Sequence, residues 1–131
     1  MMTKKIMIID DEPDILIYLM TILEDAGFET CTIEENDQVM ETIQSEQPDL
    51  IIIDIMMPKR SGISIYRELR SSDKHKNIPV AFISGMASAK DFMNNEFRKL
   101  IDDEAMSPPD GYIEKPVMVE DLIKLVEKLI K

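Results

Sequence analysis

Short runs of apolar, mostly β-branched residues alternate along the chain with longer stretches in which apolar residues recur every three or four positions. The short runs lie at residues 5–9, 28–33, 50–53, 78–83 and 112–113. Runs of this length are typical of buried strands, and the longer spacing is typical of amphipathic helices. The run at 50–53 is apolar at every position, which favours a central parallel strand that is covered on both faces.

Helix signals follow the strand-like runs. Pro13 suits the first turn of a helix, and Gly27 is a natural residue for ending that helix. Asn36 or Asp37 can cap a second helix, and residues 88–91 resemble a capping box with Asp91 in place of the usual glutamate. Five units of a strand followed by a helix predict an α/β fold with a doubly wound parallel sheet.

Length and composition narrow the class of protein. The 131 residues, 44% of them hydrophobic, fit a single domain over residues 1–131 with no linker. No stretch is long and apolar enough to predict a membrane span, and the single cysteine fits a reducing, cytoplasmic compartment. The net charge of -11 argues against direct nucleic-acid binding by this domain, since that needs a surface rich in lysine and arginine.

The residues that follow the predicted strands carry the candidate chemistry. Ligands of a doubly wound sheet bind at the carboxyl ends of its strands. The residues expected there are Asp10 and Asp11 after the first strand, Asp54 after the third, Ser84 after the fourth and Lys115 after the fifth. Three carboxylates, a hydroxyl and an ammonium group are therefore predicted to converge on one edge of the sheet.

Three carboxylates in one place repel one another unless a cation lies among them. Oxygen ligands select a hard cation, and a small site that keeps several waters favours Mg²⁺ over Zn²⁺. A carboxylate beside such an ion is a potential nucleophile toward phosphorus. Asp54 is the best candidate acceptor, because it ends the most apolar strand and has no acidic neighbour, whereas Asp10 and Asp11 form a pair suited to holding the metal.

The sequence resembles the receiver domains of two-component response regulators, including the chemotaxis regulators, over essentially its whole length. The residues that carry the resemblance are Ile8-Ile9-Asp10-Asp11-Glu12-Pro13, Asp54-Ile55-Met56-Met57-Pro58 with Gly62, Ser84, and Tyr112 with Lys115-Pro116. The resemblance implies a five-stranded, flavodoxin-like parallel sheet of strand order 2-1-3-4-5 with helices on both faces.

The resemblance also implies a role for each site residue. Asp54 accepts a phosphoryl group from a phosphohistidine of a sensor kinase, and Asp11, Asp54 and the backbone carbonyl of Met56 hold Mg²⁺, with Asp10 acting through water. Ser84 and Lys115 contact the phosphoryl group, and Ser84 with Tyr112 forms the switch that remodels the face of the fourth and fifth units. The domain is then a non-enzymatic switch that contributes to its own phosphotransfer and slow dephosphorylation.

The implied partners are a sensor histidine kinase or phosphotransfer protein and a downstream effector or output domain. The domain either stands alone or is the N-terminal part of a longer regulator, and a homodimer through the fourth and fifth units is a further option. Two alternatives stay open: a receiver-like protein-binding module that is not phosphorylated, and a phosphohydrolase on a related fold. The stretch between Ser84 and Tyr112 is longer than the family pattern, which predicts an extended fourth helix or exit loop.

Overall fold

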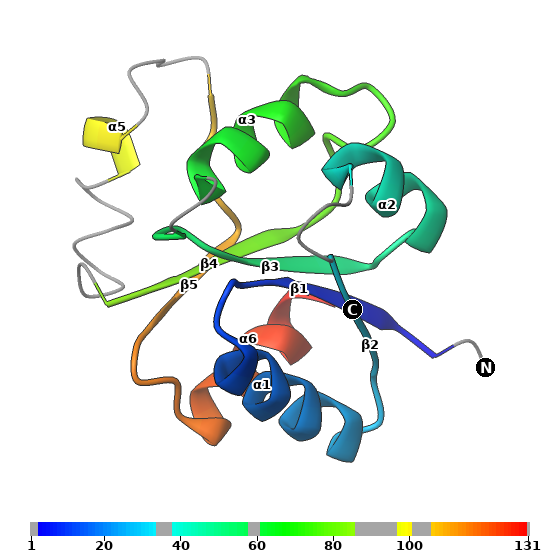
Figure 1. Cartoon of the computed structure of the whole chain (residues 1–131), viewed down its shortest axis with the longest axis vertical. Coiled ribbons are helices and arrows are strands. Elements are labelled where there is room, and N and C mark those ends of the chain that lie inside the picture. The colour runs from blue at the N-terminus through cyan, green and yellow to red at the C-terminus, as the bar shows by residue number, and fades with distance from the viewer. Residues whose placement is uncertain (1–2, 34–37, 58–60, 86–96, 101–105, 131) are drawn as a thin grey trace.

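A single parallel sheet of five strands organises the chain, in the order β2-β1-β3-β4-β5 (Figure 1). The computed structural model describes residues 3–33, 38–57, 61–85, 97–100 and 106–130. The strands are β1 (Lys5–Ile9), β2 (Glu29–Thr32), β3 (Leu50–Asp54), β4 (Val80–Ser84) and β5 (Gly111–Glu114). The helices are α1 (Pro13–Asp25), α2 (Val39–Glu46), α3 (Gly62–Ser71), α5 (Phe97–Leu100) and α6 (Val119–Leu129). The predicted fold class and strand order are confirmed.

Helices cover both faces of the sheet. Helices α2, α3 and α5 lie on one face, and α1 and α6 lie on the other (Figure 1). Alternate side chains of β3 enter the two cores, so that Ile51 and Ile53 pack in the core that contains α3, and Leu50 and Ile52 pack in the core that contains α1 and α6. Because β3 is buried on both faces, its first four residues are all apolar, and only the last, Asp54, is polar.

The ends of α1 agree with the sequence signals. Pro13 stands in its first turn, where the missing backbone N–H costs nothing. The helix ends at Asp25, and Gly27 follows with a φ of +97°, a conformation that glycine adopts without a steric penalty. The helix-start signals expected at Asn36 or Asp37 and at residues 88–91 lie outside the described residues, as does most of the long stretch between Ser84 and Tyr112.

A side-chain network anchors the start of β5. Arg70, near the end of α3, donates to Asp110 Oδ2 at 3.0 Å and to the Ile78 carbonyl at 2.9 Å. Asp110 Oδ2 also accepts from the Val80 N–H, and the Asp110 N–H donates to the Val80 carbonyl. These bonds extend the pairing of β4 with β5 back to the residue before Gly111. Strand β5 is therefore longer than the two residues predicted.

Among the described residues, no helix has the length and apolar character needed to cross a membrane.

Candidate functional site

The carboxyl ends of four strands bring together most of the residues singled out in the sequence. Asp10 follows β1, Asp54 and Ser84 are the last residues of β3 and β4, and Lys115 follows β5. Parallel pairing aligns these ends, with Asp54 opposite Ile83 and Ser84 opposite Glu114. Asp10, Asp54 and Ser84 are all buried, with exposed fractions of 6%, 3% and 1%. The sheet thus places two buried acids and a hydroxyl on the edge predicted to bind ligands.

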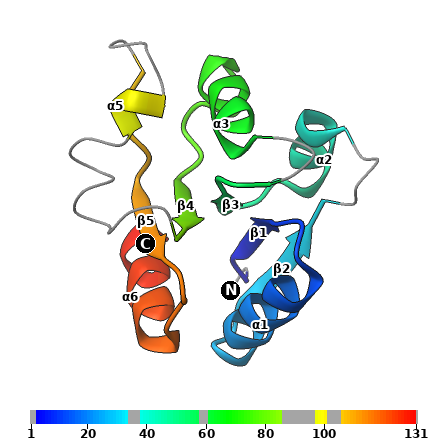
Figure 2. The ribbon, with the colours of Figure 1, turned by 60° about the vertical axis from the view of Figure 1, so that its left-hand side comes forward.

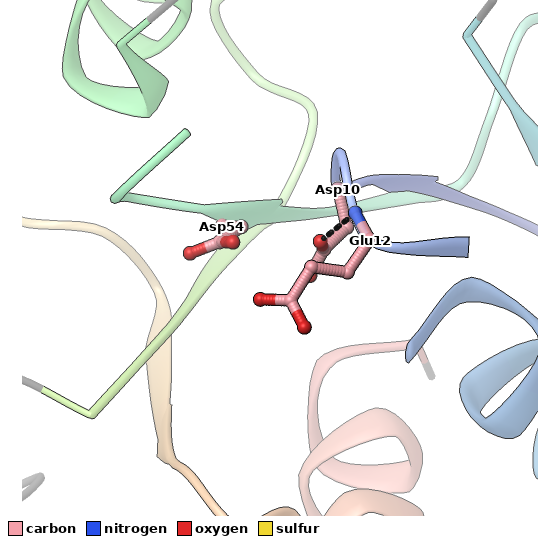
Figure 3. Close-up of side chains that lie close together, drawn as sticks. All are labelled: Asp10, Glu12 and Asp54. Carbon is pink, nitrogen blue, oxygen red and sulfur yellow. Dashed lines mark hydrogen bonds between the residues drawn. The ribbon is translucent and has the colours of Figure 1, made fainter. Parts of the chain in front are cut away.

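Three carboxyl groups form an acidic cluster at this edge. One oxygen each from Asp10, Glu12 and Asp54 lies within 4.8 Å of the others, and Figure 3 shows Asp54 at the end of its strand, facing the loop that carries the other two. Glu12 was not predicted as a ligand. Asp11, which was, has an exposed side chain and lies outside this group of the described carboxylates.

A local hydrogen bond explains why Glu12 enters the cluster. The Glu12 N–H donates to Asp10 Oδ1 at 2.8 Å, and this turn leads directly into Pro13 and α1. Asparagine and aspartate commonly accept from the backbone two residues ahead in this way. The sequence signal that points to Glu12 is therefore its position two residues after the buried aspartate.

Lys115 supplies the positive charge of the site. Its Nζ lies 3.3 Å from Asp54 Oδ2, 3.8 Å from Asp10 Oδ2 and 3.8 Å from Glu12 Oε1. The backbone N–H of Lys115 donates to the Ser84 carbonyl at 2.9 Å, which holds the start of its loop against β4. One ammonium group thus faces three carboxyl groups, and the cluster retains an excess of negative charge.

The pKa of Asp10 is raised in this arrangement. Burial raises the pKa of Asp10 from 3.8 to about 6; the hydrogen bond from Glu12 and the charge of Lys115 lower the pKa, and the charges of Asp54 and Glu12 raise it. Among the described residues, the buried Oδ2 of Asp10 has no hydrogen-bond partner, since Lys115 Nζ is too far away to donate to it. A buried carboxylate oxygen without a partner is costly, and a bound cation removes that cost. The all-oxygen donor set fits a hard cation such as Mg²⁺.

Hydrogen bonds in the loop after β3 orient the Asp54 side chain and hold α3 close to it. Asp54 Oδ1 accepts from the Met56 N–H at 3.1 Å, while the Met56 side chain points outward and is 68% exposed. Helix α3 begins against the same loop, with the Gly62 N–H donating to the Ile55 carbonyl at 3.3 Å. Ser61 caps this helix by accepting from the Ile63 N–H. The acceptor candidate therefore lies between the sheet and the first turn of α3, where Gly62 and Ile63 are buried.

Ser84 and Tyr112, the expected switch pair, are in contact through the backbone of Ser84. The Tyr112 hydroxyl donates to the Ser84 carbonyl at 3.1 Å, and the tyrosine side chain is buried, with 7% exposed. The same carbonyl also accepts from the backbone of Lys115. The carbonyl of Ser84, at the end of β4, thus accepts hydrogen bonds from both Tyr112 and the loop that begins at Lys115.

Proteins of known class are similar to this chain in sequence. The family model of the response regulator receiver domain matches residues 6–127. The chain is 31% identical to the alkaline phosphatase synthesis transcriptional regulatory protein PhoP of Bacillus subtilis, over 99% of this chain and 50% of that protein. It is also 31% identical to the phosphate regulon transcriptional regulatory protein PhoB of Pseudomonas aeruginosa, over 100% of this chain and 53% of that protein. The chain spans about half the length of these relatives.

Solved structures show the same fold. The receiver domain of NtrX from Brucella abortus superposes with a TM-score of 0.75 and 28% identity, covering 95% of this chain and 97% of that one. The chemotaxis response regulator CheY4 of Vibrio cholerae superposes with a TM-score of 0.79 over 98% of this chain and 99% of that one, at 23% identity. With the family model matching nearly the whole chain, the conclusion is plain: the protein belongs to the response regulator receiver domains, which are signalling switches.

Proposed function

We propose that this domain is the phosphoacceptor switch of a two-component phosphorelay and that Asp54 is the residue phosphorylated. The observation that carries the proposal is the placement of Asp54, a 3% exposed carboxylate at the end of the central strand, with Lys115 Nζ 3.3 Å from its Oδ2. A nucleophile and a positive charge that can neutralise an incoming phosphoryl group lie side by side.

The transfer exchanges one bond for another. An Asp54 carboxylate oxygen forms a bond to phosphorus, while the bond from phosphorus to the histidine nitrogen of the donor breaks and its electron pair stays on that nitrogen. Lys115 pairs with the phosphoryl oxygens, and the Ser84 hydroxyl hydrogen-bonds to them. The Met56 N–H, which already donates to Asp54 Oδ1, keeps the carboxylate oriented. The donor is a phosphohistidine of a sensor kinase or phosphotransfer protein.

The metal site is proposed for the same acidic cluster. Asp10, Asp11, Asp54 and the Met56 backbone carbonyl would hold Mg²⁺, and Glu12 adds a carboxylate that the structure places within the cluster. Bound Mg²⁺ would neutralise negative charge that develops on the transferring phosphoryl group. The excess of carboxyl groups over the single Lys115 ammonium and the unpartnered Asp10 Oδ2 support this placement.

The output is proposed to pass through Ser84 and Tyr112. A Ser84 hydroxyl drawn toward a phosphoryl group pulls on the end of β4, where the Tyr112 hydroxyl is bonded to the Ser84 carbonyl. The packing of the fourth and fifth units then shifts between two states. This face would pass the signal to a downstream effector, to an output domain or to a second copy of the chain. The relatives that are twice as long are transcriptional regulators, so an output domain is part of the proposal.

Incubation with a small phosphodonor tests the proposal. We expect the wild-type protein to gain the mass of one phosphoryl group with acetyl phosphate and Mg²⁺, and to gain none when EDTA replaces Mg²⁺, because the uncompensated cluster repels the anionic donor. Intact-mass spectrometry measures the product. A wild-type protein that stays unmodified over hours at saturating donor would contradict the proposal and favour a protein-binding module that is not phosphorylated.

The affinity for Mg²⁺ should depend on pH through Asp10. Its pKa near 6 means that Asp10 is mostly ionised at pH 7 and mostly protonated at pH 5, and the metal binds only the ionised form. We expect the affinity to fall by about fivefold from pH 6 to pH 5 and to approach a tenfold fall per pH unit below that, with about 0.8 proton released per Mg²⁺ bound at pH 5.5. Calorimetric titrations in two buffers of different ionisation enthalpy count the protons. Asp10→Asn is the control and should bind weakly with no step near pH 6. A wild-type affinity that does not change between pH 5 and 7 would refute the prediction.

A further inference from the structure

The Tyr18 hydroxyl has no part in the proposed phosphotransfer. Tyr18 lies on α1, and its hydroxyl donates to the backbone carbonyl of Val117 at 3.0 Å, across 99 residues of sequence. The Tyr18 side chain is 42% exposed, so its ring is not a core residue like its neighbour Leu19, which is fully buried. The hydroxyl of this half-exposed side chain makes a hydrogen bond to the backbone of another element.

This hydrogen bond joins the loop that carries Lys115 to the helix that follows the loop of Asp10 and Glu12. Helix α1 begins directly after the loop that carries Asp10 and Glu12, and Val117 lies two residues after Lys115 in the loop between β5 and α6. Helices α1 and α6 lie on the same face of the sheet (Figure 2). Tyr18 therefore links the loop after β5, which carries Lys115, to α1.

The backbone around Lys115 is held at two points. On one side, its own N–H donates to the Ser84 carbonyl at 2.9 Å. On the other side, the next backbone anchor is the Val117 carbonyl, because Pro116 has no N–H to donate. The long lysine side chain has many rotamers, and its reach to Asp54 depends on where its backbone lies. Loss of the Tyr18 hydrogen bond removes this second anchor and leaves that side of the loop held by the buried Val117 side chain, which is 7% exposed.

The geometry points to Tyr18 as a positioning residue for Lys115: its hydroxyl fixes the loop after β5 so that the ammonium group stays beside Asp54 and Asp10. This inference rests on the proposed function, in which Lys115 neutralises the charge of the incoming phosphoryl group. Among the described residues, the Tyr18 hydroxyl is hydrogen-bonded to Val117 and not to the acceptor or the metal ligands, so we expect Tyr18 to act through the lysine loop.

Tyr18→Phe tests the inference, because it removes the hydroxyl and keeps the ring. We expect labelling by acetyl phosphate at saturating Mg²⁺ to slow by about two- to tenfold, the range that corresponds to the net contribution of one hydrogen bond. The matched control is Thr30→Val, which removes the hydroxyl that donates to Glu24 Oε2 at 2.9 Å and ties the far end of α1 to β2. This control should label at the wild-type rate.

A double-mutant cycle separates positioning from general stability. In a Lys115→Met background, Tyr18→Phe should cause no further loss of rate, because there is no ammonium group left to position. Equal slowing in both backgrounds, or a Tyr18→Phe protein that labels as fast as wild type while the wild type is labelled normally, would overturn the inference. A wild type that is not labelled at all would instead count against the proposed function.

A spectroscopic measurement tests the positioning without any phosphorylation. In the wild-type protein the two ε-methylene protons of Lys115 should have separate NMR shifts, because the side chain is held among three carboxyl groups. In Tyr18→Phe they should move toward one averaged shift, and in Thr30→Val they should stay separate. Unchanged, well-separated shifts in Tyr18→Phe would contradict a positioning role.

Discussion

Asp54→Asn should lower Mg²⁺-dependent labelling by acetyl phosphate at least 100-fold, to the limit of detection by intact mass. The amide has nearly the shape of the carboxylate but is a very poor nucleophile, so no bond to phosphorus forms. The variant should stay folded, since it removes one of three clustered carboxyl groups and leaves Lys115 near Asp10 and Glu12. Thermal unfolding monitored by circular dichroism checks this.

Asp73→Asn is the matched control for Asp54→Asn. Asp73 is an almost fully exposed acid in the loop after α3, and its ion pair with Lys76 is at the surface. The substitution makes the same chemical change far from the site, and labelling should equal that of the wild type. An Asp54→Asn protein that is folded and gains a phosphoryl group at the wild-type rate would show that another residue is the acceptor.

Gly62→Ala should lower the free energy of unfolding by about 2–4 kcal/mol, although alanine is the better helix former. A Cβ at Gly62, the first residue of α3, would overlap the backbone carbonyl oxygen of Asp54 and lie 2.9 Å from Ile53 Cγ2. These contacts are with backbone and with a buried strand, so neither neighbour can move aside without cost. Relief requires α3 to withdraw from the acceptor loop, and the labelling rate should therefore fall as well.

Gly85→Ala is the control for the glycine substitution. Among the described residues, a Cβ at Gly85 would meet Lys115 Cβ alone, at the ordinary van der Waals distance of 3.8 Å, so its effect on stability should be below about 1 kcal/mol. Urea unfolding of both variants measures the difference. If Gly62→Ala were no less stable than Gly85→Ala, then α3 would not be held against the backbone of Asp54 as described.

The sequence predicted the sheet and most of the site for a simple reason. Strands that are buried on both faces must be apolar throughout, so β1, β3 and β4 stand out as runs, and the first polar residue after each run marks the carboxyl end of the strand. Asp10, Asp54 and Ser84 were found in this way, because parallel pairing brings such ends to one edge. Lys115 comes one residue later, after Glu114, and was found from its place at the end of the fifth run. The strand order came from the resemblance of the motifs to a known family.

The membership of the acidic cluster could not be predicted from spacing. Asp11 and Glu12 are adjacent and both acidic, and which of them lies near Asp54 depends on the backbone turn that Asp10 forms with the Glu12 N–H. Both side chains are exposed, but it is Glu12 that places a carboxylate oxygen in the group with Asp10 and Asp54. At a turn, the side chains of two neighbouring residues point in very different directions. The periodicity of apolar residues in the sequence does not predict these directions.

The sequence by itself thus determined the class of fold, the edge of the sheet where the chemistry lies and the residue types available there, because burial and strand period leave a pattern that can be read locally. Only the tertiary structure decided which side chains touch: Lys115 against three carboxyl groups, Tyr18 against Val117, and Gly62 against Asp54. These contacts join residues that are far apart in the chain or lie at a turn. Each requires its atoms to be placed to within a few tenths of an ångström, and that placement arises only when the helices pack on the sheet.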